Sequence, residues 1–288
     1  QVRNVVLACA NHESALRRFP QGAAYNWNAG DDSNGLSWNV FVLPYMEDGV
    51  VSDQLTDMYA DAQANDQQIN VYDDELERLN QVGIGIYTCP SDSGAVDKWN
   101  KDYQAASYAG VMGSAVSRGA AKYIVTGGGG SMSIDGILFP LSEVRPRRIT
   151  DGLSKTFIVG ERWYQLRVWT AGVYFIGGGW TVQQPDEPAE NSFVSACKNI
   201  SGAYPLNAEL DQVGYYVSHD NRYDRPNMPA GAPQTIPFNS IPFGSMHPGG
   251  ANFAHADGSV VFVNDGVSGD VMEALASRNG GEIDHRID

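Results

Sequence analysis

The sequence is poor in cysteine, in positive charge and in long apolar runs. Its 288 residues include 3 Cys, 5 His and 19 Lys plus Arg, against 34 Asp plus Glu, for a formal net charge of −15. Three cysteines are too few for a disulfide framework, and no pair has the C-x-x-C spacing of a zinc site. A surface this acidic repels phosphate backbones, so we expect no nucleic-acid partner. No window reaches the roughly 18 consecutive apolar residues of a membrane span.

The composition is that of a folded, loop-rich and β-rich protein. Hydrophobic residues make up 42% of the chain and charged residues 18%, with 32 Gly and 14 Pro. At roughly 150 residues per domain, the length allows one large domain or two small ones. Because no shift in composition marks a linker, we predict one globular head over residues 19–288, preceded by a helix over residues 1–18.

The N-terminal helix is predicted from apolar residues at helical spacing: Val2, Val5, Val6, Cys9 and Leu16. Arg17 and Arg18 fall in its last turn, where cations favour the helix dipole, and the helix should stop at Phe19-Pro20. The sequence starts at Gln1 inside this apolar pattern, so we expect that an upstream part of the helix has been removed.

The rest of the chain is predicted to be mainly strands. A short helix should follow Ser37, the acidic stretch from Ser52 to Asn80 should be exposed, and a last helix should cover Gly269 to Arg278. Strand signals cover Ile84 to Cys89, Ser107 to Met112, Gly136 to Phe139, Thr156 to Glu161 and Val168 to Ile176. This order predicts an α+β fold with an N-terminal helix on a mainly antiparallel sheet and long loop insertions.

A hairpin is predicted at Asp257-Gly258, which separates two strand-like runs. Asp-Gly suits a two-residue type I′ turn, in which both residues need positive φ. That register places Phe253, His255, Val260 and Phe262 on one face, which we expect to be the core side.

Several residues could carry chemistry. His247, His255 and Asp257 could form a metal or acid/base cluster, but a structural turn with a hydrogen-bonded His is the favoured interpretation, since a turn Asp more often bonds its own backbone. Cys89 and Cys197 could form one disulfide, or remain free core residues. Glu161 could pair with Arg147 or Arg148.

Signatures of the common nucleotide-binding and hydrolytic sites are missing. The sequence has no Gly-x-Ser-x-Gly elbow and no phosphate-binding Gly-x-x-x-x-Gly-Lys loop. We therefore expect no catalytic residue and no enzyme.

The spacing of His247 from Asp257-Gly258 resembles a known bacterial family, the prepilin-like proteins with a processing-associated H-X9-DG domain of unknown function. Further matching motifs run in order along nearly the whole chain: Phe19-Pro20, Gly35-Leu36-Ser37-Trp38, Leu43-Pro44-Tyr45, Cys89-Pro90-Ser91-Asp92, Ser107-Tyr108-Ala109-Gly110, Ile149 to Thr156, Val159-Gly160-Glu161-Arg162 and His247 to Asn252. His255 departs from the family pattern, which more often has a bulky aromatic there.

The resemblance implies a structural pilin-like or pseudopilin subunit of a type IV pilus or type II secretion system. Such a subunit is anchored in the inner membrane by its N-terminal helix before assembly, and its head is displayed outside the cytoplasm or in a cell-surface filament. Its partners would be other pilin-like subunits, which it would contact through the missing part of the helix. The same missing part would be its only contact with the membrane. The chain as given should be monomeric, without a required cofactor. By analogy with pseudopilin heads, calcium could bind at Asp220, Asn221 and Asp224 or at Asp257.

Two other functions stay open from the residues. A calcium-dependent carbohydrate-binding or adhesin head would expose aromatic residues from the group Trp163, Tyr164, Trp169, Tyr174 and Trp180. A secreted metal-dependent hydrolase would bring His247, His255 and an acidic residue around one ion.

Overall fold

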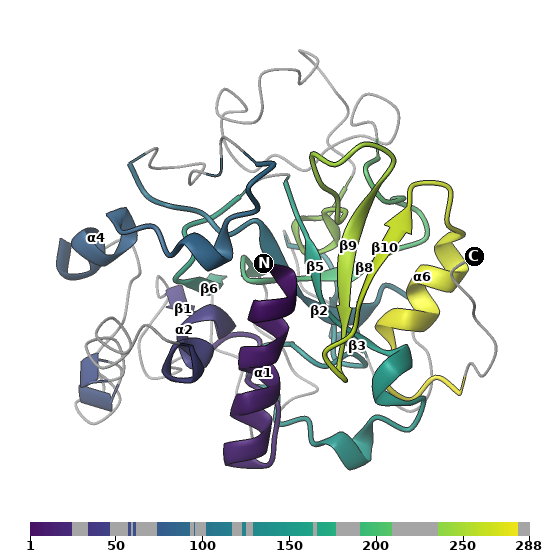
Figure 1. The fold of residues 1–288 in the computed structure, drawn as a ribbon, viewed down its shortest axis with the longest axis horizontal. Helices are drawn as coiled ribbons and strands as arrows, with labels where there is room; N and C mark the ends of the chain where they lie inside the picture. The colour runs from purple at the N-terminus through teal and green to yellow at the C-terminus, as the bar shows by residue number, and fades with distance from the viewer. Residues whose placement is uncertain are drawn as a thin grey trace.

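The computed structural model describes residues 1–24, 34–46, 57–58, 60–61, 74–92, 95, 102–116, 123–124, 129–163, 166–176, 191–208 and 236–281. Its helices are α1 (Val2–Leu16), α2 (Trp38–Val42), α4 (Asp74–Gln81) and α6 (Gly269–Ala276), with short 3-10 turns η1 (Leu43–Tyr45), η2 (Gly85–Tyr87), η3 (Pro146–Arg148), η4 (Leu153–Lys155) and η6 (Phe238–Ser240). Its strands are β1 (Asn34–Leu36), β2 (Tyr108–Ser114), β3 (Tyr123–Ile124), β4 (Met132–Ser133), β5 (Phe157–Glu161), β6 (Ala171–Ile176), β7 (Asn191–Val194), β8 (Cys197–Ile200), β9 (Gly250–His255) and β10 (Val260–Asn264) (Figure 1).

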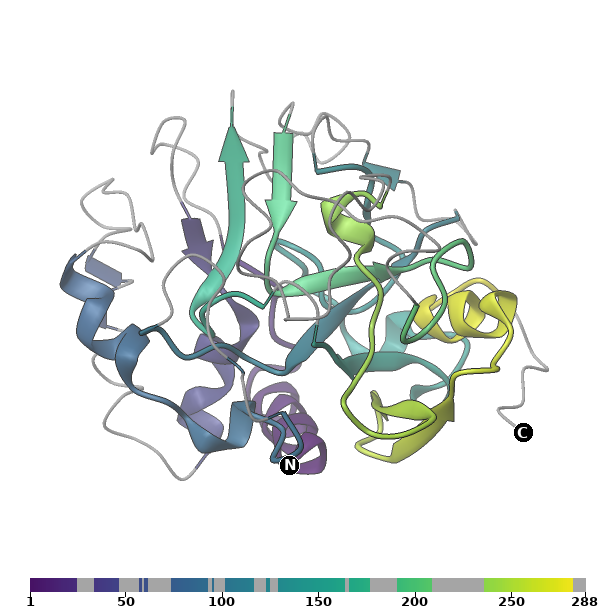
Figure 2. The same ribbon diagram turned by 90° about the horizontal axis from the view of Figure 1, so that it is seen from above.

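The principal sheet has five strands in the order β10-β9-β5-β2-β8. All neighbouring pairs in it are antiparallel except β2 and β8, which are parallel. A three-stranded antiparallel sheet, β1-β6-β7, and the β3-β4 pair complete the described strands. Figure 2 shows β6 and β7 side by side, in opposite directions, on the side of the molecule away from α1. The predicted α+β class with a mainly antiparallel sheet is confirmed.

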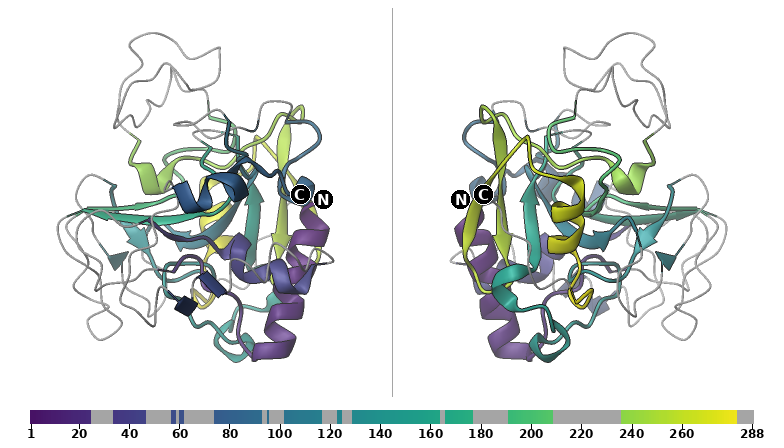
Figure 3. Two further views of the ribbon diagram at one scale, coloured as in Figure 1. Left: turned by 90° about the vertical axis from the view of Figure 1, so that its left-hand side faces the viewer. Right: turned by 90° about the vertical axis from the view of Figure 1, so that its right-hand side faces the viewer.

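Both faces of the five-stranded sheet are covered. Along β2, Tyr108 and Met112 belong to one hydrophobic cluster while Ala109 and Val111 belong to another, as expected for side chains that alternate across a strand. Helix α1 contacts β5 and β9 in the first cluster, and α6 contacts β2, β5 and β8 in the second. Figure 3 shows these two helices on different sides of the strands. The central strands are therefore buried on both faces.

Helix α1 packs on the sheet with the predicted stripe. Its buried residues are Val2, Val5, Val6, Ala8, Cys9 and His12, at the spacing of one helix face. Leu16 departs from the prediction, because its side chain is 50% exposed, and Leu7 on the outer side is 55% exposed. The helix ends where Arg17 takes a left-handed conformation, φ 58°. Among the described helices, none combines the length and hydrophobicity of a membrane span.

Two predicted strands are wrong. The run Ile84 to Cys89 contains the 3-10 turn η2, closed by the Tyr87 N–H donating to the Ile84 carbonyl. The run Gly136 to Phe139 lies beside β2 but forms no regular strand ladder with it. Its Gly136 N–H donates to the Met112 carbonyl, and its Leu138 N–H donates to the Val111 carbonyl. Both runs are rich in β-formers, but strand propensity depends on whether a neighbouring strand offers partners.

The hairpin at the C-terminal side exists, but its turn and register differ from the prediction. Among the turn residues only Gly258 has positive φ, 88°, and its N–H donates to the His255 carbonyl. This is a turn centred on Ala256-Asp257 followed by a left-handed Gly, the three-residue hairpin loop. Val261, not Phe262, therefore opposes Phe253. A one-residue slip moves side chains to the other face, so Phe262 is 47% exposed and the predicted four-residue core face is wrong.

We predict that Val6→Ala lowers the free energy of unfolding by about 2 kcal/mol, since it removes buried methyl groups beneath α1. Leu7→Ala is the neighbouring control on the exposed side and should change it by less than about 0.5 kcal/mol. Urea unfolding of both variants measures the difference. Equal losses at the two positions would contradict the packing of α1 on the sheet.

Candidate metal centre

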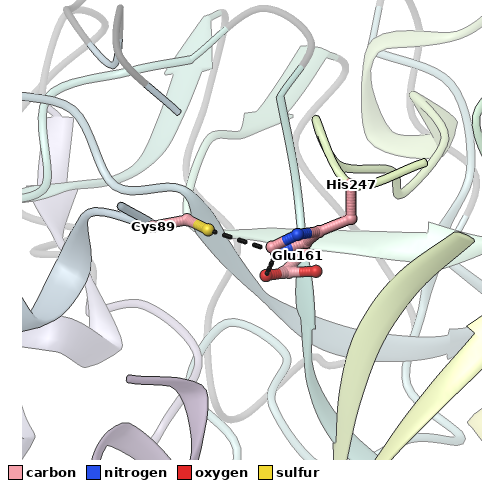
Figure 4. A group of neighbouring side chains, drawn as sticks. All are labelled: Cys89, Glu161 and His247. Atoms are coloured by element: carbon pink, nitrogen blue, oxygen red, sulfur yellow. Dashed lines mark hydrogen bonds and ion pairs between the residues drawn. The ribbon is translucent and has the colours of Figure 1, made fainter. Parts of the chain in front are cut away.

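Three side chains from distant parts of the chain meet at one end of β5. The Cys89 Sγ lies 3.5 Å from the His247 Nε2, which lies 3.2 Å from the Glu161 Oε1 (Figure 4). One ligand atom from each residue lies within 4.8 Å of the other two. Within the described ranges, no other three His, Cys, Asp or Glu side chains converge in this way.

Cys89 is positioned by the turn that follows η2. The Asp92 N–H donates to the Cys89 carbonyl, which closes a turn with Pro90 at its second position. The Ser107 hydroxyl donates to the Asp92 carboxylate at 3.0 Å, and the Ser107 N–H donates to the Tyr87 carbonyl. These bonds hold the turn against the start of β2.

Glu161 is the last residue of β5, and its side chain is only 4% exposed. The Asn252 backbone N–H and Nδ2 both donate to the Glu161 Oε2, at 2.6 and 3.0 Å. A buried carboxylate needs such partners, because an isolated charge in the interior is very costly. Since Oε2 is held by Asn252, Oε1 is the oxygen that faces His247 and Cys89.

His247 lies in the loop that leads into β9. Its N–H donates to the Ser245 hydroxyl, which in turn donates to the Gly250 carbonyl at 2.7 Å. The Asn207 Oδ1 accepts the Ser245 N–H and so ties this loop to the segment after β8. The His247 side chain is 30% exposed, so the cluster is open to solvent on the His247 side.

The geometry does not fit a nucleophilic cysteine. In a Cys-His-acid triad the thiol and the acid bind different ring nitrogens, whereas here the Cys89 Sγ and the Glu161 Oε1 meet the same Nε2. Burial first, and then the neighbouring Glu161 carboxylate, raise the pKa of the Cys89 thiol. A reactive cysteine needs a lowered pKa. The arrangement instead directs three donor atoms toward one point.

Of the two possibilities for Cys89 and Cys197, the structure has free core residues and no disulfide, because all three cysteines are free and buried. Cys89 faces His247, whereas the Cys197 thiol donates to the Gly22 carbonyl beneath the sheet. The predicted ion pair of Glu161 with Arg147 or Arg148 is wrong, since the Glu161 carboxylate contacts His247 and Asn252.

The motif residues separate in space. His247 joins Glu161, but His255 lies at the other end of β9, where its ring packs on Phe157 and its Nδ1 contacts the Ser259 hydroxyl at 3.1 Å. The Asp257 Oδ1 accepts the Ser259 N–H and hydroxyl within its own turn. His247 and His255 therefore do not surround one ion, as the hydrolase alternative required, and the favoured structural turn is observed.

The described aromatic side chains that were candidates for a carbohydrate-binding surface pack against hydrophobic clusters of the protein interior. Trp169 is buried and stacks on Tyr87 with ring centroids 5.9 Å apart, as a core residue does. Trp163 is half-buried and packs against the small cluster around Phe238. The calcium candidates Asp220, Asn221 and Asp224, together with Tyr164, Trp180 and the side chain of Tyr174, lie outside the described residues.

Sequence reasoning missed Cys89 and Glu161 as neighbours of His247. Each of the three belongs to one of the ordered motifs, so the signal was present as three separate segments. These segments meet only because β5 pairs with β2 and β9. Cys89 and His247, for example, are 158 residues apart in the chain.

His255 should make the head less stable in mild acid. Burial lowers the pKa of its imidazole, and the Asp257 charge opposes this only in part. In the unfolded chain, a His has a pKa of about 6.5, so in mild acid the unfolded chain binds more protons than the folded chain. The stability that the neutral His255 contributes is therefore present above that pKa and is lost as the pH falls toward the lower pKa of the folded state. We predict that His255→Phe, which keeps a ring against Phe157, flattens the fall in unfolding free energy between about pH 7.5 and 5.5. Identical pH profiles for variant and parent would contradict a buried neutral imidazole.

Comparison with protein families gives one match over most of the chain. The family model described as "Protein of unknown function (DUF1559)" matches residues 1–269. No curated protein and no solved structure gives a significant match. Because the match covers α1, the five-stranded sheet and all three residues of the cluster, the chain belongs to the DUF1559 family of proteins of unknown function.

Proposed function

We propose that the chain is the head of a structural, pilin-like or pseudopilin subunit, and that α1 is the part of the stalk helix that packs on this head. The observation that carries the proposal is the seating of α1, whose stripe includes Val5, Val6 and Cys9, each no more than 1% exposed. Because its apolar stripe holds α1 on the sheet, anything bound at the N-terminal end of α1 would be firmly connected to the head. On its other side, Leu7 is 55% exposed.

The surface properties are compatible with an assembly role outside the cytoplasm. The net charge of −15 keeps heads from associating without a specific contact and disfavours nucleic acid. The Cys89 thiol lacks the environment of a nucleophile, and this supports a role without catalysis at that residue. In the proposed subunit the contacts between copies are made through α1 and its upstream continuation.

The test uses the protein expressed from its complete coding sequence in its own host. We predict that it fractionates with the inner membrane or with filaments, and that Leu7→Cys yields disulfide-linked or reagent-linked oligomers. Val82→Cys is the matched control, because Val82 is also an exposed apolar residue, 43% against 55% for Leu7, but lies beyond α4. The native cysteines are at most 7% exposed, so they should contribute little to cross-linking between chains.

The chain of residues 1–288 should remain monomeric in the same cross-linking experiment. A full-coding-sequence protein that stays in the soluble cytosolic fraction, with no cross-linking through Leu7→Cys, would contradict the pilin-like proposal. Cross-linking through Val82→Cys alone would also contradict it, because the contact would then lie on the head and not on α1.

A further inference from the structure

We infer that Cys89, Glu161 and His247 bind a transition-metal ion, with Zn²⁺ as the best fit. The inference is independent of the pilin-like proposal, since it depends on side chains of the head alone. The three donor atoms lie within 4.8 Å of one another and come from the turn after η2, the end of β5 and the loop before β9. An ion at their centre would join three segments that are far apart in the chain.

Two of the three distances between the donor atoms are those between ligands of a tetrahedral zinc ion. With Zn–S near 2.3 Å and Zn–N or Zn–O near 2.0 to 2.1 Å, neighbouring ligands lie about 3.5 Å apart for S and N and about 3.3 Å apart for N and O. The cluster has 3.5 Å between the Cys89 Sγ and the His247 Nε2, and 3.2 Å between that Nε2 and the Glu161 Oε1. A cation at the centre of the cluster can bind all three atoms at once.

The chemistry of the donors selects the class of ion. Thiolate and imidazole are the ligands of zinc and related transition metals, whereas calcium and magnesium take oxygen ligands. On binding, Cys89 releases its thiol proton to solvent and forms an S–Zn bond. The thiolate and the carboxylate then balance the two positive charges of the ion, in a pocket where Glu161 and Cys89 are nearly fully buried.

The surroundings orient the ligands and leave one position open. Asn252 occupies the Glu161 Oε2 with two N–H groups, which directs Oε1 to the ion, as outer partners do in metal sites. His247, with 30% of its side chain exposed, marks the open side, where a water molecule or a side chain of another protein would complete four-coordination.

The experiment uses the purified chain after chelator treatment. We expect one Zn²⁺ per chain by competition with a chromophoric chelator, a thiolate-to-metal charge-transfer band with Co²⁺, and no effect of Ca²⁺ at the same concentration. A hundredfold excess of Zn²⁺ over its Kd should raise the melting temperature by about 5 to 10 °C, because the ion binds only the folded chain.

The variants separate the ligands from their surroundings. Cys89→Ser and His247→Gln should each weaken Zn²⁺ binding more than about 100-fold, and Asn252→Ala, which removes one outer hydrogen bond, about 10-fold. Cys9→Ala and His255→Phe are the matched controls at a cysteine and a histidine outside the cluster, and they should bind like the parent chain.

A second readout needs no variant. Cys89 is 7% exposed while Cys9 and Cys197 are fully buried, so a small alkylating reagent should label Cys89 first, and Zn²⁺ should slow that labelling at least tenfold. Absence of stoichiometric Zn²⁺ binding, a Co²⁺ complex without a thiolate band, or binding that survives Cys89→Ser and His247→Gln would each overturn the inference. Labelling of Cys89 at the same rate with and without Zn²⁺ would overturn it as well.

Discussion

The structure depends on one buried carboxylate, Glu161, at the end of a strand that is covered on both faces. Its charge cannot be left without partners in the interior, and those partners come from β9 through Asn252 and from the loop before β9 through His247. Its backbone also accepts the Gly244 N–H and pairs with Tyr108 of β2. The hydrogen bonds and contacts of Glu161 therefore fix the relative positions of β2, β5, β9 and the Cys89 turn.

The parts of the fold that the sequence predicts are those governed by local periodicity. The stripe of α1, the strands β2 and β5 and the final helix follow from 3.6-residue and strand patterns that their packing preserves. The hairpin register differs from the prediction because Asp257-Gly258 suits two turn types, and only the packing of β10, which buries Val263 and leaves Phe262 exposed, decides between them. The run Ile84 to Cys89 was missed because strand propensity does not reveal whether a partner strand exists.

The candidate site was predictable only in pieces. His247 stood out through its spacing from Asp257, yet these two residues lie at opposite ends of β9. For Cys89 the sequence leaves a disulfide and a free core residue open, and for Glu161 it suggests an ion pair with an arginine. Both are ordinary interpretations of single residues in local context. A metal site with adjacent ligands has a spacing that can be read from the sequence, whereas ligands gathered from three segments become neighbours only through strand pairing.

The convergence on Glu161 is tested most directly by a double-mutant cycle of Glu161→Gln and His247→Gln, measured by urea unfolding in the presence of chelator. Residues in one buried hydrogen-bonded network should show a coupling free energy of about 1 to 3 kcal/mol, because each variant removes a partner that the other needs. Free-energy changes that add to within about 0.3 to 0.5 kcal/mol would show that the two side chains do not meet, and would contradict the account.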